Sequence, residues 1–235
     1  MSENYLWAPP AVASVPVQGK AERFPIQRLF FVGRNYHAHA AEMGKTVDKS
    51  KERPFYFTKS PSTLVHSGAT VAYPPETKNY HHEMELVIAI GKPGFRVSHD
   101  QAHEIIYGYA CGLDMTRRDL QLDARDKGRP WDLGKDFEQS AVFAALSRKG
   151  VFDSIGSQRI QLRVNGETKQ DAMLADLIWK VDEIISHLSQ FYHLEPGDLI
   201  MTGTPAGVGP VNPGDVIDGS IEGLEPVRLT IAEPA

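Results

Sequence analysis

Three carboxylates occur where folding could bring them together. Glu83 and Glu85 lie two residues apart in HHEMELVIAIG, which alternates as a strand does, so both project from one face, about 6.6 Å apart along the chain. Asp114 follows the apolar segment YACGL and precedes a predicted helix, a position from which functional groups often emerge. Adjacent carboxylates repel unless solvent or a cation relieves them, and oxygen ligands without cysteine favour Mg²⁺ or Mn²⁺ over zinc. These residues therefore predict a magnesium or manganese site.

A simpler interpretation of Glu83 and Glu85 stays open from the sequence. Charges on a solvent-exposed edge strand protect a sheet against aggregation, and Glu-x-Glu is a weak pattern by itself. Asp114 favours the metal site over this alternative. His81 and His82 adjoin the pair, and we interpret them as a polar strand entry rather than as ligands.

A second candidate for chemistry is the pair His39-x-x-Glu42. Residues three apart share a face of a helix, and a carboxylate beside an imidazole fixes its tautomer and raises its basicity. The pair thus predicts a general base. An isolated pattern of this kind is more often an ordinary surface helix, and that alternative also stays open.

Lys135 lies in GRPWDLGKDFEQS, among aromatic and aliphatic residues. A half-buried lysine there could pair with the acids or bind an anionic substrate. A surface lysine in a charge-balanced loop is the equally acceptable alternative.

Several common catalytic signatures are missing from the sequence. It contains no G-x-S-x-G nucleophile elbow, no G-x-x-x-x-G-K-[ST] phosphate loop and no H-E-x-x-H zinc helix. Its one cysteine, Cys111, excludes an internal disulfide and a multi-cysteine metal site. Because Cys111 stands in an apolar run, we interpret it as a core residue.

Composition narrows the class of protein further. The 235 residues carry 25 basic and 30 acidic side chains, a net charge of -5 that argues against nucleic-acid binding. The longest aliphatic runs fall far short of the roughly 20 residues needed to cross a bilayer. The first residues lack the basic start and apolar core of a secretory signal. We therefore expect a cytoplasmic protein with one main domain and no membrane partner.

Strands must supply most of the elements that position these residues. Strand-like segments are separated by Pro, Gly and the probable hairpin turn Asn165-Gly166, and they rarely alternate with helices, so a doubly wound fold is excluded. Helices are expected at four places. These are residues 35–43, with Asn35 as the cap and Gly44 at the end, and residues 99–106, 116–127 and 174–190. The Pro-rich residues 1–26 predict an extended arm on the body or on a partner subunit, ahead of a catalytic domain over residues 27–235.

Taken together and in order, the segments resemble the fumarylacetoacetate hydrolase family. They are GRNYHAHAAEMG, PFYFTKSPS, HHEMELVIAIG, GLDMTRRDLQ, GRPWDLGKDF, EPGDLIMTGTPAGVGPVNPGD and IEGLEPVRLTI. The resemblance covers residues 28 to 232 and is greatest to short, single-domain members that cleave acylpyruvates. It implies an α+β, β-rich fold, a mixed β-sheet roll of the fumarylacetoacetase C-terminal type, assembled as a homodimer.

The same resemblance implies roles for the side chains that match the family's motifs. These roles are binding of Mg²⁺ or Mn²⁺ for Glu83, Glu85 and Asp114, catalysis for His39, Glu42 and Lys135, and substrate binding for Gln121, Thr204 and Lys59. His39 with Glu42 would activate the water, and Gln121 with Lys135 would stabilise the oxyanion.

The implied reaction is hydrolysis of a carbon–carbon bond in a 2,4-dioxo acid, with fumarylpyruvate, in gentisate-type aromatic catabolism, as the expected substrate. Fumarate and pyruvate would be the products. Two alternatives stay open. One is other chemistry at the same metal, either oxaloacetate decarboxylation or the isomerisation and decarboxylation of hydroxylated dienedioates. The other is a non-catalytic binding protein on the same scaffold. The sequence leaves the acyl group undetermined.

Overall fold

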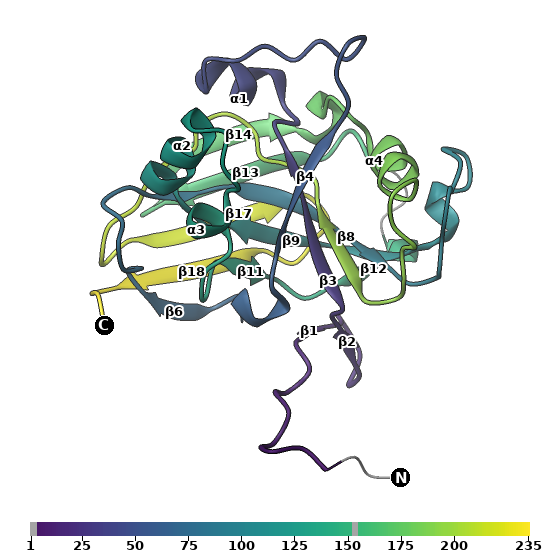
Figure 1. Cartoon of the computed structure of the whole chain (residues 1–235), viewed down its shortest axis with the longest axis horizontal. Helices are drawn as coiled ribbons and strands as arrows, with labels where there is room; N and C mark the ends of the chain where they lie inside the picture. The colour runs from purple at the N-terminus through teal and green to yellow at the C-terminus, as the bar shows by residue number, and fades with distance from the viewer. Residues whose placement is uncertain (1–3, 152–154) are drawn as a thin grey trace.

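Strands dominate the structure, a computed structural model that describes residues 4–151 and 155–235. The largest sheet runs through the middle of the molecule and mixes parallel and antiparallel neighbours (Figure 1). Its order is β4 (Phe55–Lys59), β3 (Arg28–Gly33), β15 (Asp198–Met201), β8 (Met84–Ile90), β9 (Ile106–Asp114), β11 (Ala141–Phe143) and β5 (Leu64–His66), with β12 (Ser147–Arg148) also paired to β9.

A second sheet packs against one face of the first. Its order is β14 (Glu167–Met173), β13 (Arg159–Val164), β17 (Val216–Ile221), β18 (Val227–Ala232) and β6 (Ala69–Ala72). Two small ladders complete the strands. They are β10 (Thr116–Arg117), β7 (Tyr80–His82) and β16 (Gly209–Pro210), and the hairpin of β1 (Ser14–Pro16) and β2 (Arg23–Pro25). The predicted β-rich α+β fold with a mixed sheet is confirmed.

Helices are short throughout the described residues. The α-helices are α1 (His37–Glu42), α2 (Arg118–Asp126), α3 (Asp132–Lys135) and α4 (Val181–Leu188), and the 3-10 turns are η1 (Pro61–Thr63), η2 (Ala102–Glu104), η3 (Lys149–Val151) and η4 (Leu174–Asp176). The helix expected over residues 174–190 is therefore a 3-10 turn followed by a separate, shorter helix. No helix in this part of the chain has the length and apolar character to cross a membrane.

The centre of the main sheet is buried on both faces. Leu86 and Ile88 of β8 belong to the core between the two sheets, whereas Val87 and Ala89 belong to a second cluster on the opposite face. A strand buried on both faces cannot be the exposed edge strand of the simpler interpretation, which is therefore wrong. Cys111 of β9 is fully buried in the first cluster, as expected.

Two local predictions have opposite outcomes. The turn Asn165-Gly166 is confirmed, because both residues have positive φ angles of 51° and 82° and join β13 to β14. Asn35, in contrast, does not cap a helix. Its side-chain amide donates to the carbonyl oxygens of Trp179 and Thr202, and its Oδ1 accepts from the Trp179 N–H at 2.7 Å. Long-range backbone partners thus replace the local cap, and α1 starts at His37 without a side-chain cap.

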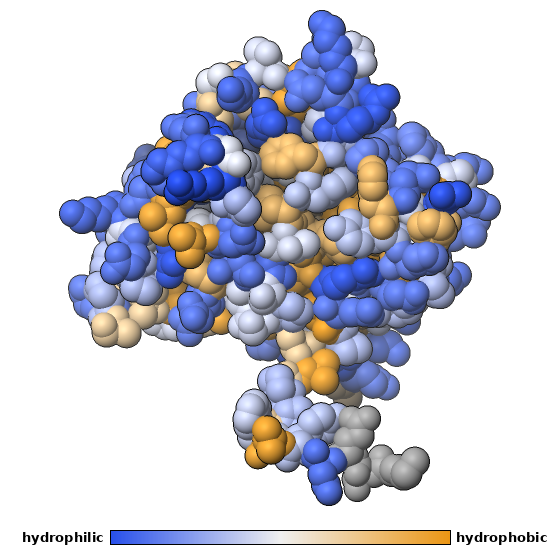
Figure 2. Space-filling view, in the orientation of Figure 1, coloured by the Kyte–Doolittle hydropathy of each residue, from blue (hydrophilic) through white to orange (hydrophobic). Residues whose placement is uncertain are grey.

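The arm expected over residues 1–26 has two parts in the structure. The β1–β2 hairpin packs on the body through Val15 and Phe24, which belong to the second core cluster. The segment before it extends away from the body (Figure 1), with Leu6 93% exposed and Trp7 75% exposed. Figure 2 shows it as a separate projection with an apolar group on its surface. The boundary between arm and catalytic domain stays a prediction.

Candidate metal centre

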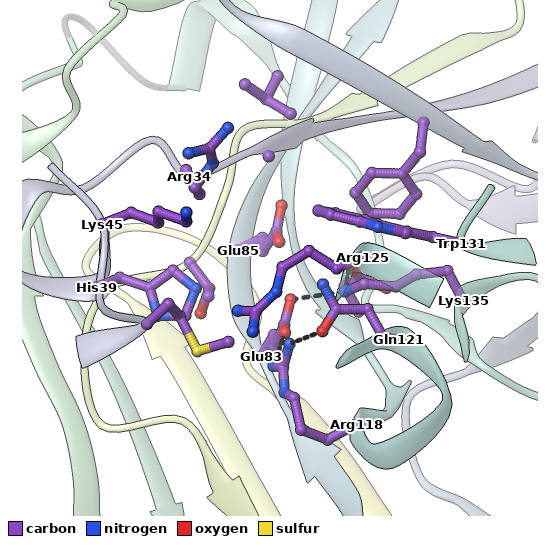
Figure 3. A pocket seen from close by; sticks show the side chains of 16 residues that line it. Arg34, His39, Lys45, Glu83, Glu85, Arg118, Gln121, Arg125, Trp131 and Lys135 are labelled. Carbon is purple, nitrogen blue, oxygen red and sulfur yellow. Dashed lines mark hydrogen bonds and ion pairs between the residues drawn. The ribbon is translucent and has the colours of Figure 1, made fainter. Parts of the chain in front are cut away.

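Three carboxylates converge at the ends of two neighbouring strands. Glu83 lies at the junction of β7 and β8, Glu85 in β8, and Asp114 at the end of β9. The Asp114 N–H donates to the Glu83 carbonyl oxygen at 2.9 Å, which holds these strand ends together. One oxygen from each side chain lies within 4.8 Å of the others, and all three residues are buried. All three line one end of a pocket, and Glu83 and Glu85 are labelled there in Figure 3.

Lys135 is fully engaged with these acids. Its Nζ lies 2.8 Å from Glu83 Oε2, 2.5 Å from Asp114 Oδ2 and 2.7 Å from Thr116 Oγ1. The residue is buried, more deeply than the half-buried position expected from its sequence. Gly134 makes this possible, since a Cβ there would lie 2.7 Å from the Gln121 nitrogen. The glycine lets α3 approach α2 closely enough to place Lys135 at the carboxylates.

Lys59 lies behind the carboxylates rather than in the pocket. Its Nζ is 2.7 Å from Asp114 Oδ1 and donates to the carbonyl oxygens of Met115 and Ser140 at 3.0 and 2.9 Å. The contact with Asp114 is an ion pair without hydrogen-bond geometry, because Oδ1 accepts no hydrogen bond within the described structure. The expected contact with substrate is not what this geometry supports. Lys59 is placed to hold Asp114.

The acids differ sharply in how their charges are balanced. Burial opposes ionisation of Glu83, but Lys135 and Arg118 outweigh it and hold the pKa of Glu83 well below its usual range. Glu85 has only the Gly203 N–H, at 2.6 Å, as a hydrogen-bond donor among the described residues. Burial, followed by the charges of Asp114 and Glu83, raises the pKa of Glu85 well above its usual range. A divalent cation among the three side chains would remove this conflict.

The ligand set fits the expected cation. Three carboxylates converge without any cysteine, and Asp114 Oδ1 lacks a hydrogen bond in the described residues. Mg²⁺ and Mn²⁺ take oxygen ligands and keep further positions for water or substrate. Glu83, Glu85 and Asp114 together can therefore hold such an ion.

The His39–Glu42 contact expected from the helical spacing is present. Glu42 Oε2 lies 3.1 Å from His39 Nδ1, and the Gly207 N–H donates to Glu42 Oε1 at 3.1 Å. Partial burial raises the pKa of Glu42, but the hydrogen bonds from His39 and Gly207 outweigh it and leave that pKa lowered. His39 is buried and lines the pocket, with Glu42 behind it. This arrangement leaves the Nε2 side of the ring for a water molecule.

Gln121 and Thr204 line the same pocket as the acids and His39. Gln121 Oε1 accepts from Arg118 at 3.1 Å, which leaves the Gln121 amide N–H groups for the cavity. Thr204 Oγ1 accepts from the Gln170 amide at 2.7 Å, which leaves the Thr204 O–H as a donor for the cavity. Of the side chains named from the sequence, Lys59 and Glu42 do not line the cavity in the described structure.

Arg118 is a functional side chain that sequence reasoning missed. It is buried, donates to Glu83 Oε1, and sits one helical turn before Gln121. The spacing of Arg118 and Gln121 on one helix face was the available signal. The family motif implies a role for Gln121 but none for Arg118, because the residues that this helix face contacts depend on tertiary packing.

Comparison with known proteins decides the family. A family model described as "Fumarylacetoacetate (FAA) hydrolase C-terminal" matches residues 28–232. The chain belongs to the fumarylacetoacetate hydrolase family. The family predicted from the sequence motifs is thus confirmed, and residues 28–232 are the part that carries it.

Relatives of stated activity match this chain over nearly their whole length. A fumarylpyruvate hydrolase from Ralstonia sp is 65% identical over 190 residues, which is 80% of this chain and 98% of that protein. A mitochondrial oxaloacetate tautomerase from Mus musculus is 38% identical over 87% of this chain and 91% of that protein. The crystal structure of fumarylpyruvate hydrolase from Pseudomonas aeruginosa, in complex with Mn²⁺ and pyruvate, matches with a TM-score of 0.93 and 46% identity over 98% of this chain and 100% of that chain.

Proposed function

We propose that this family member is a Mg²⁺- or Mn²⁺-dependent hydrolase that cleaves fumarylpyruvate to fumarate and pyruvate, in aromatic catabolism of the gentisate type. The observation that carries the proposal is the three-carboxylate site beside the His39–Glu42 pair in one pocket. The relative from Ralstonia sp supports this substrate, and the Pseudomonas aeruginosa complex supports the metal.

Glu83, Glu85 and Asp114 would hold the cation. When bound, it supplies Lewis acidity toward the 2-oxo acid end of the substrate. The chain's own cations keep Glu83 ionised for this purpose. Lys135 and Arg118 neutralise Glu83, whereas Glu85 is left for the cation to balance.

His39 removes a proton from the attacking water. Glu42 holds Nδ1, so the imidazole keeps one tautomer and accepts the proton at Nε2. The water then attacks the distal ketone, and the Gln121 amide donates to the oxygen that becomes negative. Collapse of this adduct breaks the bond between the former ketone carbon and the methylene carbon, which releases fumarate and leaves pyruvate as its enolate. The proton held at His39 Nε2 returns to that methylene carbon. Lys135 was expected to share that task. Because all three of its N–H donors face Glu83, Asp114 and Thr116, we assign it to positioning the carboxylates.

Steady-state kinetics of the Mn²⁺-loaded protein tests the proposal. Fumarylpyruvate, acetylpyruvate, oxaloacetate and a hydroxylated dienedioate are compared by loss of enol absorbance and by product analysis. We expect pyruvate and fumarate from fumarylpyruvate at the highest kcat/KM. Faster decarboxylation of oxaloacetate, or faster isomerisation of the dienedioate, would assign the site to the other chemistry. Protein that neither binds metal nor turns over any substrate would be a binding protein.

A homodimer in the cytoplasm completes the proposal. The apolar residues Leu6 and Trp7 on the projecting arm support an assembled state, since a contiguous exposed apolar segment commonly marks an interaction site.

A further inference from the structure

Cationic side chains line the pocket away from the carboxylates, and the steps above do not use them. Lys45 follows α1, Arg125 lies in the last turn of α2, and Arg34 follows β3. Figure 3 shows Lys45 and Arg125 entering from opposite sides, with their charged ends pointing into the cavity. The pocket therefore has an acidic end and a basic rim.

The charges on this rim are only partly balanced by the protein. Lys45 is exposed and has no ion pair with any described residue. Arg125 is half-buried, and its Nε and Nη2 pair with Asp126 Oδ1 at 2.9 and 2.8 Å, which leaves Nη1 without a partner among the described residues. Arg34 lies farther along the rim, held 4.8 Å above the Phe55 ring. An anionic ligand group would find at least two available donors here.

The wall between the two ends is aromatic. Phe57 and Trp131 line the cavity with their ring centroids 5.7 Å apart, and Val32 and Met43 add apolar surface. Such a wall suits a flat, apolar segment rather than a polar one. The pocket thus offers an acidic, metal-binding end, an apolar middle and a basic rim, which matches a ligand with a carboxylate at each end.

We propose that Lys45 and Arg125 form a subsite for the second carboxylate of the substrate, so that the enzyme selects dicarboxylic acylpyruvates over monocarboxylic ones. This inference rests on the proposed function and specifies the acyl group that the sequence leaves undetermined. Charge-assisted hydrogen bonds to a carboxylate are the strongest that such side chains make, and a substrate without that carboxylate leaves both cations unsatisfied.

The variants Lys45→Gln and Arg125→Gln test this subsite through a ratio. We compare kcat/KM for fumarylpyruvate with kcat/KM for acetylpyruvate, and expect the ratio to fall about ten- to a hundredfold in each variant. Two matched controls each remove one positive charge close in sequence to the tested residue. They are Lys51→Gln, whose lysine pairs with Asp48, and Lys127→Gln, whose lysine pairs with Asp123. Their ratios should stay within about twofold of wild type.

Binding of a matched ligand pair gives a readout without turnover. Fumarate and crotonate differ by one carboxylate in place of a methyl group, and their affinities for the Mn²⁺-loaded protein are measured by calorimetry. We expect fumarate to bind more tightly in the wild type and the difference to vanish in Lys45→Gln and Arg125→Gln.

The outcomes separate this subsite from the proposed function. One outcome is that both variants hydrolyse both acylpyruvates with the wild-type ratio of kcat/KM for fumarylpyruvate to kcat/KM for acetylpyruvate. That result would overturn the subsite but not the hydrolase activity. Absence of turnover on either substrate would overturn the hydrolase, and the fumarate–crotonate difference would still decide the subsite.

Discussion

His39 and the carboxylates serve two separable purposes in one pocket. His39 and Glu42 belong to α1 and make no hydrogen bond to a metal ligand among the described residues, whereas Glu83, Glu85 and Asp114 come from the strand ends. Their effects should therefore come apart under mutation.

His39→Ala is expected to lower acylpyruvate hydrolysis by about 10² to 10⁴, the usual contribution of a general base. Mn²⁺ affinity should stay near that of wild type, and any side decarboxylation of oxaloacetate should fall much less, since loss of CO₂ needs no attacking water. Calorimetric metal titration and kinetics on both substrates measure this. A wild-type rate of hydrolysis would show that the pair does not activate the water.

Lys59→Met is expected to act on stability rather than on substrate recognition. Removing a buried ammonium from Asp114 breaks a buried ion pair, which costs about 3–5 kcal/mol and lowers Tm by about 10 °C. The fumarylpyruvate-to-acetylpyruvate ratio of kcat/KM should not change. Lys51→Met, on an 81% exposed side chain, serves as the control. An unchanged Tm with a raised KM would restore the substrate contact expected from the sequence.

At the scale of elements, the loop after β15 connects the two halves of the site. Its Gly203 N–H donates to Glu85, Thr204 lines the pocket, and its Gly207 N–H donates to Glu42. Displacement of this loop should therefore disturb the metal carboxylate and the catalytic pair together.

Gly207→Ala provides that displacement. Gly207 has a φ of +92°, and a Cβ there would lie 1.9 Å from the Lys169 carbonyl oxygen, so the loop must move. We expect kcat/KM for hydrolysis to fall even at temperatures well below the Tm of the variant, where the protein is still folded. Gly214→Ala is a matched control, because Gly214 has the same φ with nothing within 4 Å of its Cβ. Equal activity losses in both variants would mean that backbone strain, not loop position, is responsible.

At the scale of the whole molecule, the metal should stabilise the fold. A ligand that binds the native state alone adds about 2.7 kcal/mol at a concentration 100 times its Kd. Chelation should thus lower Tm and abolish activity, and Mn²⁺ or Mg²⁺ should restore both. Glu85→Gln removes the acid whose pKa is raised, so its metal-free Tm should not fall below that of metal-free wild type. Full activity in metal-free wild type would contradict the metal assignment.

The projecting arm predicts an assembled state. We expect a dimer by light scattering at micromolar concentration, and a weaker dimer after removal of residues 1–12, which precede the β1–β2 hairpin. The hairpin and the catalytic body should keep their Tm, since the exposed Leu6 and Trp7 lie outside both core clusters. A monomeric full-length chain with a protease-labile arm would contradict this prediction.

Local periodicity explains what the sequence by itself determined. The alternation in HHEMELVIAIG predicted a strand, the Asn165-Gly166 pair predicted the β13–β14 hairpin, and His39-x-x-Glu42 predicted one shared helix face. Each of these features depends on backbone geometry within a few residues, which side-chain type and spacing encode directly. The spacing of Glu83 and Glu85, together with Asp114, predicted the carboxylate set and its cation, and the family motifs added roles for Gln121, Thr204 and Lys59.

Only the tertiary structure decided which partners these elements meet. It buried β8 on both faces, turned Asn35 to the backbone of Trp179, and placed Lys59 behind Asp114. It also brought Lys45 and Arg125, 80 positions apart in the numbering, to one rim. These outcomes depend on contacts between segments far apart in the chain, and a buried polar side chain takes whatever partner the packing supplies. The spacing of residues within one segment therefore does not predict that partner.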